Sequence, residues 1–331
     1  MIRISARRST RTTLAMLLLA ASTTSNGNTT HPFHDSTYAA PASTTHSTAA
    51  EAALDTLVQT LPPTDLRLLE PHLDVALARQ RNGDHEAAID ALQQALHIHR
   101  MHHGLFDPGQ LAVVERLLES HYALGRWQQV DDLQHYRFHI ARHQIAAGTG
   151  TRLAALLELT RWKLHAAKHG LLDNLLQGTH EVAELHRREL QLLPPDAPSH
   201  QLAMHHVSIA DMELEQARQK LRAPFGASAG FGMVAPALGL HGPLQLLDNG
   251  HGQPALIEDF ELPVNAEHHA IDALDVSRHL HEFKSAIARA HKLANQEPPS
   301  MAATGQQLGQ SIQRSIDDYN GFVASVVLGR F

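Results

Sequence analysis

The sequence has no cysteine among its 331 residues and is poor in aromatic side chains. The absence of cysteine excludes disulfide bridges and thiolate metal sites. Aromatic residues make up only 5% of the chain, whereas alanine, leucine, glutamine and histidine are plentiful, a composition that suits an all-α protein. A net charge of −7 argues against a nucleic-acid partner, which is usually recognised by a basic surface.

Long apolar runs are also missing. Residues 14–21, LAMLLLAA, form a short apolar run that is too brief to span a bilayer. Four arginines and no acidic residue precede this run and small residues follow it, which is the pattern of a secretory signal peptide. We therefore expect residues 1–22 to be removed, the mature chain to have no integral membrane span, and the protein to be exported to a bacterial periplasm. The alternative is an uncleaved tail on a cytosolic protein.

Composition divides the rest of the chain into four segments. Residues 23–50 are rich in serine and threonine with few core-forming residues, so we expect a disordered tether. Residues 51–221 have helical periodicity and form the predicted helical array. Residues 222–264 are rich in glycine and proline without a helical period, and a gap of that length indicates a domain boundary or a lid-like loop. Residues 265–331 return to a helical pattern.

Two successive helical hairpins organise the chain. Gly83 and Gly125 hold equivalent turn positions 42 residues apart, each between two helical patterns. The helices expected for these hairpins are 70–81, 84–99, 108–124 and 126–143. Such a unit can bury its apolar face only against a neighbour, so the pattern predicts a stack of helix pairs.

Small residues at packing positions and the turn glycines resemble the tetratricopeptide repeat (TPR), in the 42-residue variety found in kinesin light chains. The residues that carry the resemblance are Ala76, Ala88, Ala95, Leu92, Gly83 and Gly125. Arg79 and His121 stand where the family prefers tyrosine. The resemblance implies an all-α, TPR-like helical-hairpin solenoid of about three repeats plus a cap, with a degenerate helical C-terminal region.

A third hairpin is expected from residues 151–168 and 171–192, with Gly170 at its turn. Its second helix lacks the small residues and contains Gly178, so this unit is degenerate. A further helix, 198–221, is expected to close the array, because terminal repeats are usually atypical.

The resemblance also implies a binding surface, the concave groove lined by the first helix of each hairpin. The residues that the register places on this groove are Leu73, Leu77, Gln80, Glu115, Glu119, Tyr122, Thr160 and Leu164. Glu115 and Glu119 favour a neutral or basic extended segment or helix of another protein as the ligand. The leucines of the set could instead pack between repeats. The expected function is an exported scaffold for protein–protein interaction.

Histidine is unusually abundant, with 27 residues. His135, His139 and His143 lie at i, i+4 and i+8, so they share one helix face and could bind Zn or Cu as neutral imidazoles. No carboxylate accompanies them at the spacing of a known zinc motif, which favours solvated surface histidines and no cofactor. A histidine-rich periplasmic protein that binds metal or responds to pH is the alternative function.

Ser228 lies in a GxSxG pattern, residues 226–230. A nucleophile elbow needs a buried strand before the serine and a helix after it, and the flanking residues provide neither. A hydrolase is therefore the weakest of the alternatives, and we expect no catalysis.

Overall fold

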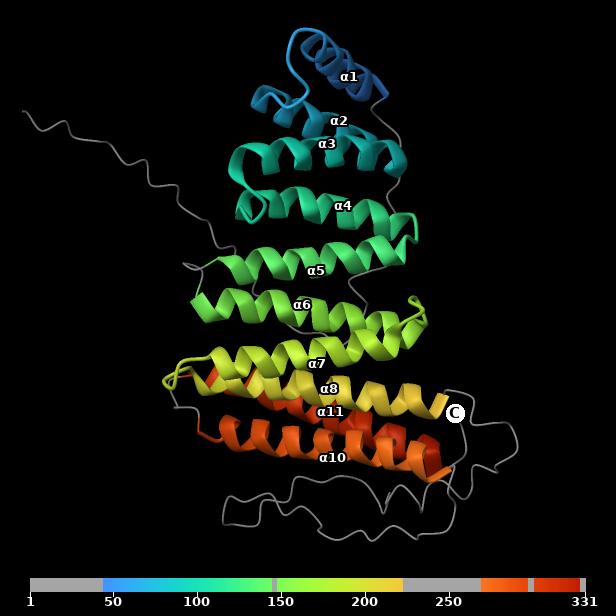
Figure 1. Ribbon diagram of the computed structural model, residues 1–331, viewed down its shortest axis with the longest axis vertical. Helices are drawn as coiled ribbons and strands as arrows, with labels where there is room; N and C mark the ends of the chain where they lie inside the picture. Colours follow the sequence, from blue (N-terminus) through green and yellow to red (C-terminus); the bar gives the residue numbers. More distant parts are fainter. Residues whose placement is uncertain (1–43, 145–147, 223–268, 297–300, 328–331) are drawn as a thin grey trace, which may run out of the picture. The chain divides into compact units, whose positions relative to one another are not determined.

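Helix is the only regular structure in the residues that the computed structural model describes, which are 44–144, 148–222, 269–296 and 301–327. Successive helices pack against one another in the order of the sequence (Figure 1). The helices are α1 (Thr44–Val58), α2 (Leu69–Arg81), α3 (His85–His103), α4 (Leu111–Ala123), α5 (Trp127–His143), α6 (Gly148–His169), α7 (Leu175–Leu192), α8 (Ser199–Arg222), α10 (His269–Ala294) and α11 (Ala302–Val327). The predicted all-α class is confirmed.

The first two hairpins, α2–α3 and α4–α5, repeat with a constant offset. Helices α2 and α3 and the short 3-10 turn η1 (Leu66–Leu68) each begin 42 residues before α4, α5 and η2 (Pro108–Gln110), respectively. Gly83 and Gly125 stand at the hairpin turns with φ of +77° and +64°, a left-handed conformation that glycine adopts without a steric penalty. The TPR-like 42-residue repeat is confirmed by this geometry.

Each of these hairpins is preceded by an aspartate that caps its entry turn. The Asp65 and Asp107 side chains accept hydrogen bonds from the backbone N–H groups two residues further on, at 2.9 and 2.8 Å. We predicted an α-helix directly after Asp107, with Pro108 as its first residue. Instead Pro108 begins η2 and the α-helix starts at Leu111, because the capped turn closes with 3-10 geometry.

Small residues let the paired helices approach closely. Ala76 of α2 and Ala88 of α3 are both fully buried, as predicted for a TPR-like hairpin. Val130 of α5, where the family usually has alanine, is also fully buried, so the second hairpin accommodates the larger side chain. Ala76 and Val130 belong to one apolar core that runs through α2–α7.

The third hairpin, α6–α7, departs from the repeat. Gly170 follows α6 with φ +62°, as expected for a turn glycine, but α7 begins at Leu175, later than predicted. Gly178 is buried within α7, and a Cβ atom there would lie 3.0 Å from the Lys163 Nζ atom of α6. Glycine therefore gives the Lys163 side chain room between the two helices.

Helix α8 ends the array and also belongs to a second core. One face of α8 packs against α7, and α10 and α11 cover another. The second core combines residues of α8, α10 and α11, among them Val207, Leu214, Phe283, Ile287, Leu308 and Tyr319. The composition change at residue 222 therefore does not separate two cores, since helices on both sides of it share one. None of the helices described is long and apolar enough to cross a bilayer.

Candidate functional site

The residues predicted to line the groove are distributed over α2, α4 and α6, and several of them make internal contacts. Leu73, Tyr122 and Leu164 are half-buried and pack against the first core. The Gln80 amide donates to the Arg116 carbonyl and to the Ser120 hydroxyl, both at 2.8 Å, which joins α2 to α4. Leu77 is half-buried on α2.

Thr160 is the one predicted groove residue that the structure moves to the interior. Its side chain is buried, donates to the Leu156 carbonyl at 2.9 Å and lies 2.8 Å from His186 Nε2. The helical register was extrapolated from the first two hairpins, and α6 is longer than their first helices, so the register does not carry over. Thr160 is a packing residue between α6 and α7.

The two acidic residues of the predicted groove are exposed but paired. Glu115 lies 3.6 Å from the Arg137 guanidinium of α5, and Glu119 lies 3.0 Å from the Arg116 guanidinium on its own helix. These pairs reduce the negative charge that the face presents. The predicted preference for a neutral or basic ligand therefore has less support than the acidic residues alone suggested.

The three histidines predicted as a metal site occupy two different environments on α5. His135 Nε2 lies 3.8 Å from Asp131 Oδ2, and burial together with the Lys163 cation lowers the pKa of His135. His139 and His143 lie nearer the end of the helix, where the His143 ring stacks on Phe106 at 3.9 Å between centroids. In the part of the chain that the structure describes, no three His, Asp or Glu side chains gather in a way that could hold a metal ion.

A buried ion cluster joins α5 to α6. The Asp131 carboxylate accepts from Trp162 Nε1 at 2.7 Å, and Lys163 Nζ approaches it to 2.6 Å. Asp131 and Lys163 are 7% and 3% exposed, so both charges depend on each other for stabilisation. We interpret this cluster as a structural element between the second and third hairpins.

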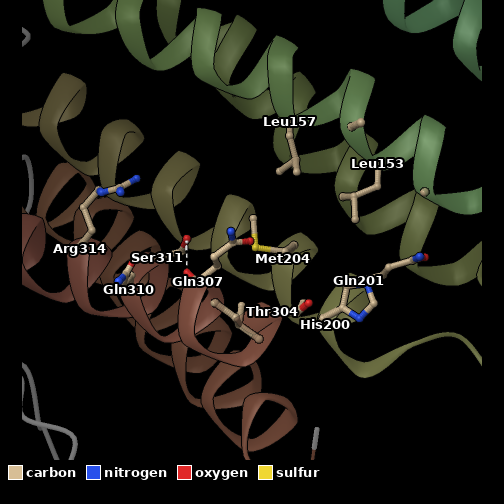
Figure 2. Close-up of a pocket in the computed structure, with 13 residues that line it drawn as sticks. Leu153, Leu157, His200, Gln201, Met204, Thr304, Gln307, Gln310, Ser311 and Arg314 are labelled. Atoms are coloured by element: carbon tan, nitrogen blue, oxygen red, sulfur yellow. Dashed lines mark hydrogen bonds between the residues drawn. The ribbon is translucent and has the colours of Figure 1, made fainter. Parts of the chain in front are cut away.

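A pocket of about 510 Å³ lies where α6, α8 and α11 meet (Figure 2). Its apolar lining comes from all three helices and includes Leu153, Leu157, Met204 and Leu308. Its polar lining includes Gln201, Thr304, Gln307, Gln310, Ser311 and Arg314. The volume falls within the range of ligand pockets in proteins. Figure 2 shows Leu153 and Leu157 projecting from α6 toward the pocket and Arg314 at its α11 side.

Sequence reasoning did not find this pocket. Its walls come from segments that are more than 100 residues apart, Leu153 on α6 and Leu308 on α11, and no motif marks them. Only the packing of α11 beside α8 brings them together. Ser228 and its GxSxG pattern, like residues 1–22, lie outside the described residues.

Comparison with known proteins finds similarity over part of the chain to solved structures. No protein-family model matches the sequence, and no curated protein does. Two solved structures of nearly identical TPR-like repeats of the kinesin light chain type, from Podosopora anserina, are similar to part of the chain. The identities are 18% and 19% and the TM-scores 0.37 and 0.35, and each alignment covers 53% of this chain and 79% of the other.

Proposed function

We propose that this protein is a helical-repeat scaffold that binds a segment of another protein in the pocket between α6, α8 and α11, without catalysing a reaction. The observation that supports the proposal is the combination of an apolar floor with an amide-rich rim. Leu157 and Met204 would receive an apolar side chain, while Gln307 and Gln310 can hydrogen-bond to the backbone of an extended peptide.

The charge of the rim indicates which peptide would fit best. Arg314 is an exposed cation on the α11 side of the pocket. A guanidinium binds a carboxylate with two parallel hydrogen bonds, so an acidic residue beside the apolar anchor would be favoured. The preferred ligand is therefore an acidic segment with a large apolar side chain, in contrast to the neutral or basic ligand that the predicted groove favoured.

Selection from a displayed peptide library on the full mature chain tests this. We expect enriched peptides to contain an apolar residue next to Asp or Glu. Leu157→Asp and Arg314→Gln should each weaken their binding by about tenfold or more, which corresponds to roughly 1.4 kcal/mol. Leu176→Asp, at an exposed leucine of α7, and Gln306→Ala, next to the pocket residue Gln307, are the matched controls and should bind normally.

The same peptides distinguish the pocket from the predicted groove. If binding is unaffected by the pocket variants but is lost in Glu115→Ala and Glu119→Ala, the ligand occupies the face formed by α2 and α4. In that case the peptide-binding site of the scaffold would be the groove that the TPR resemblance implied, and not the pocket. Peptides that bind all variants equally would contradict both locations.

We also propose export of the mature chain, on the basis of the basic and apolar residues that precede residue 22. N-terminal sequencing of the protein from the cell envelope should find a start near Ser22 or Ser25. An intact Met1 on protein recovered only from the cytosol would contradict export.

A metal-binding function is the second candidate, favoured by the closeness of His139 and His143, whose ring centroids lie 4.4 Å apart. Calorimetry with Zn and with Cu should then show micromolar or tighter binding that disappears when His135, His139 and His143 are changed to Gln. Absence of binding heat in the wild-type protein would contradict a metal function for these residues.

A further inference from the structure

Two buried histidines meet where α6, α7 and α8 pack together. His186 of α7 is fully buried and His205 of α8 is 2% exposed. Their Nδ1 atoms lie 2.8 Å apart, which is a hydrogen-bond distance. Only one proton can occupy the space between two nitrogen atoms at this separation, so one ring donates and the other accepts.

The hydroxyl group of Thr160, which contacts His186, determines which of the two rings donates. The Thr160 hydroxyl gives its proton to the Leu156 carbonyl, so the oxygen of Thr160 accepts from His186 Nε2 at 2.8 Å. His186 therefore carries its proton on Nε2, and its bare Nδ1 accepts from the Nδ1–H of His205. Both imidazoles are neutral in this arrangement, and the hydrogen bonds run in one direction from α8 through α7 to α6.

We propose that the His186–His205 contact is an acid-sensitive junction, which holds α8 against α7 at neutral pH and releases it in mild acid. A proton added to His186 must go to Nδ1, where it faces the Nδ1–H of His205. A hydrogen bond would then be replaced by two opposed donors and a buried positive charge, which is costly away from water.

The surroundings of the pair strengthen the effect. Burial lowers the pKa of His186 well below its ordinary value and that of His205 to about 4, and each is lowered further by a neighbouring histidine. His206, next along α8, has a pKa lowered to about 4 by burial and by Arg289 of α10. While α8 is packed, positive charge on any of these three imidazoles is therefore unfavourable.

Three buried carboxylates of α7 and α8, those of Glu189, Glu213 and Glu215, have ion-pair partners, whereas Asp211 of α8 accepts from the Ser315 hydroxyl of α11 at 2.6 Å. Glu189 of α7 lies 3.7 Å from Arg142 of α5 and 3.4 Å from Arg152 of α6. Glu213 of α8 is bound by Arg187 and, at 2.6 Å, by His279 of α10. Burial raises the pKa of Glu213, but the hydrogen bonds from His279 and Arg187 outweigh it and hold that pKa below its ordinary value. Glu189 and Glu213 are thus paired with other side chains. Burial raises the pKa of Asp211 to about 7, but Asp211 stays bonded to Ser315 when α8 and α11 move together, so it does not titrate with the opening of the junction.

The sign of the pH dependence of the junction follows from the two histidines. Unfolded or separated histidines titrate near pH ~6.5, whereas the packed pair resists protonation until the pH is much lower. Between these two pH values, the state in which α8 has separated from α7 binds more protons than the packed state. The free energy that holds α8 against α7 therefore decreases as the pH falls through this window. Above roughly pH 7 both states are neutral, and the junction contributes no pH dependence.

Release of α8 would move more than one helix. Because α8 shares its core with α10 and α11, these three helices should separate from α7 as a unit. The pocket has one wall on α6 and its others on α8 and α11, so the same opening would widen it. A wider pocket would release a bound peptide in acid, and this consequence rests on the proposed function. The opening of the junction itself does not.

Hydrogen–deuterium exchange on the full chain without ligand tests the junction alone. After correction for intrinsic exchange rates, the open population reported by α7 and α8 amides should rise on the order of 10- to 30-fold per histidine between about pH 7.5 and pH 5. The double variant His186→Phe with His205→Leu removes both titrating groups and should lose this rise. Substitution of the exposed His139 and His143 by Gln is the control and should preserve it.

A second measurement does not depend on the variant folding. Nitrogen-15 NMR of the wild-type histidines should show His186 protonated at Nε2 and His205 at Nδ1 at neutral pH. Reversed tautomers, or α7 and α8 amides whose protection is the same at both pH values, would overturn the proposal. An unchanged pH response in a folded double variant would overturn it as well. Peptide affinity is measured separately, so failure of the scaffold function would not be mistaken for failure of the junction.

Discussion

Lys163 and Asp131 form an ion pair that is almost entirely removed from water. Lys163→Met should leave the Asp131 carboxylate buried without its cation and destabilise the protein by roughly 3–5 kcal/mol. The double variant Asp131→Asn with Lys163→Met should recover much of that loss, because the Asn oxygen can still accept from Trp162 Nε1. Urea denaturation of the wild type, both single variants and the double variant would measure this. Additive losses in the double variant would contradict the coupling.

Ala88 allows the apolar packing between α2 and α3 to be tested in the same way. It is fully buried on α3, in the hairpin that α3 forms with α2, so Ala88→Leu should overpack the interface and cost on the order of 1–3 kcal/mol. Ala112→Leu on α4 introduces the same side chain at an exposed position and should change the free energy of unfolding by no more than about 0.5 kcal/mol. Equal denaturation midpoints for the two variants would argue against close packing at Ala88.

At the scale of the element, the turn between α2 and α3 depends on the backbone of Gly83 rather than on its neighbours. Its φ is +77°, and an added Cβ would have no heavy atom within 4 Å. The expected cost is therefore conformational only, roughly 1–2 kcal/mol for Gly83→Ala, less for Gly83→Asn and more for Gly83→Val. Thermal denaturation of the three variants should give that order. A uniform loss would indicate a steric cause instead.

The elements that could be predicted from the sequence are those with local signals. Gly83 and Gly125 mark turns because the backbone conformation there favours glycine, and Asp84 caps α3 by accepting from the Ala87 N–H at 3.2 Å. The start of α7 was predicted too early. Asp173 and Asn174 are residue types that favour an N-cap, and Asn174 stands at that position, but its side chain makes no capping hydrogen bond. Local chemistry predicts helix ends where a cap or a glycine is present, and not elsewhere.

For the whole molecule, the second core predicts how the chain responds to truncation. A chain that ends at Arg222 retains α1–α8 but exposes the apolar residues of α8 that α10 and α11 cover, among them Val207 and Leu214. We expect this truncated protein to bind a hydrophobic dye strongly and to aggregate, which light scattering and dye fluorescence would detect. A monomeric, fully stable fragment would show that α10 and α11 are dispensable for the fold.

The pocket and the histidine junction could not have been predicted from the sequence for the same physical reason. The pocket combines residues of α6 and α11, which are far apart in the chain, whereas His186 and His205 lie on the neighbouring helices α7 and α8. Local periodicity does not reveal which side chains of two helices face each other. The groove was predicted from the helical register of the first two hairpins. This register places Gln80 and Glu119 on their helices, but it does not reveal that both side chains bond to other residues of the protein. Thr160 shows where the register no longer holds.

Gly178 has a consequence for how this sequence can change over time. The Lys163 ammonium and the adjoining methylenes would lie 3.0–3.5 Å from any Cβ at position 178, so the lysine and the glycine form one steric unit. A Cβ atom at 178 would require the Lys163 ammonium to shift, which disturbs its pairing with the buried Asp131 carboxylate. Positions 131, 163 and 178 should therefore covary in an alignment of homologues, with Gly178 retained wherever the Asp131–Lys163 pair is kept.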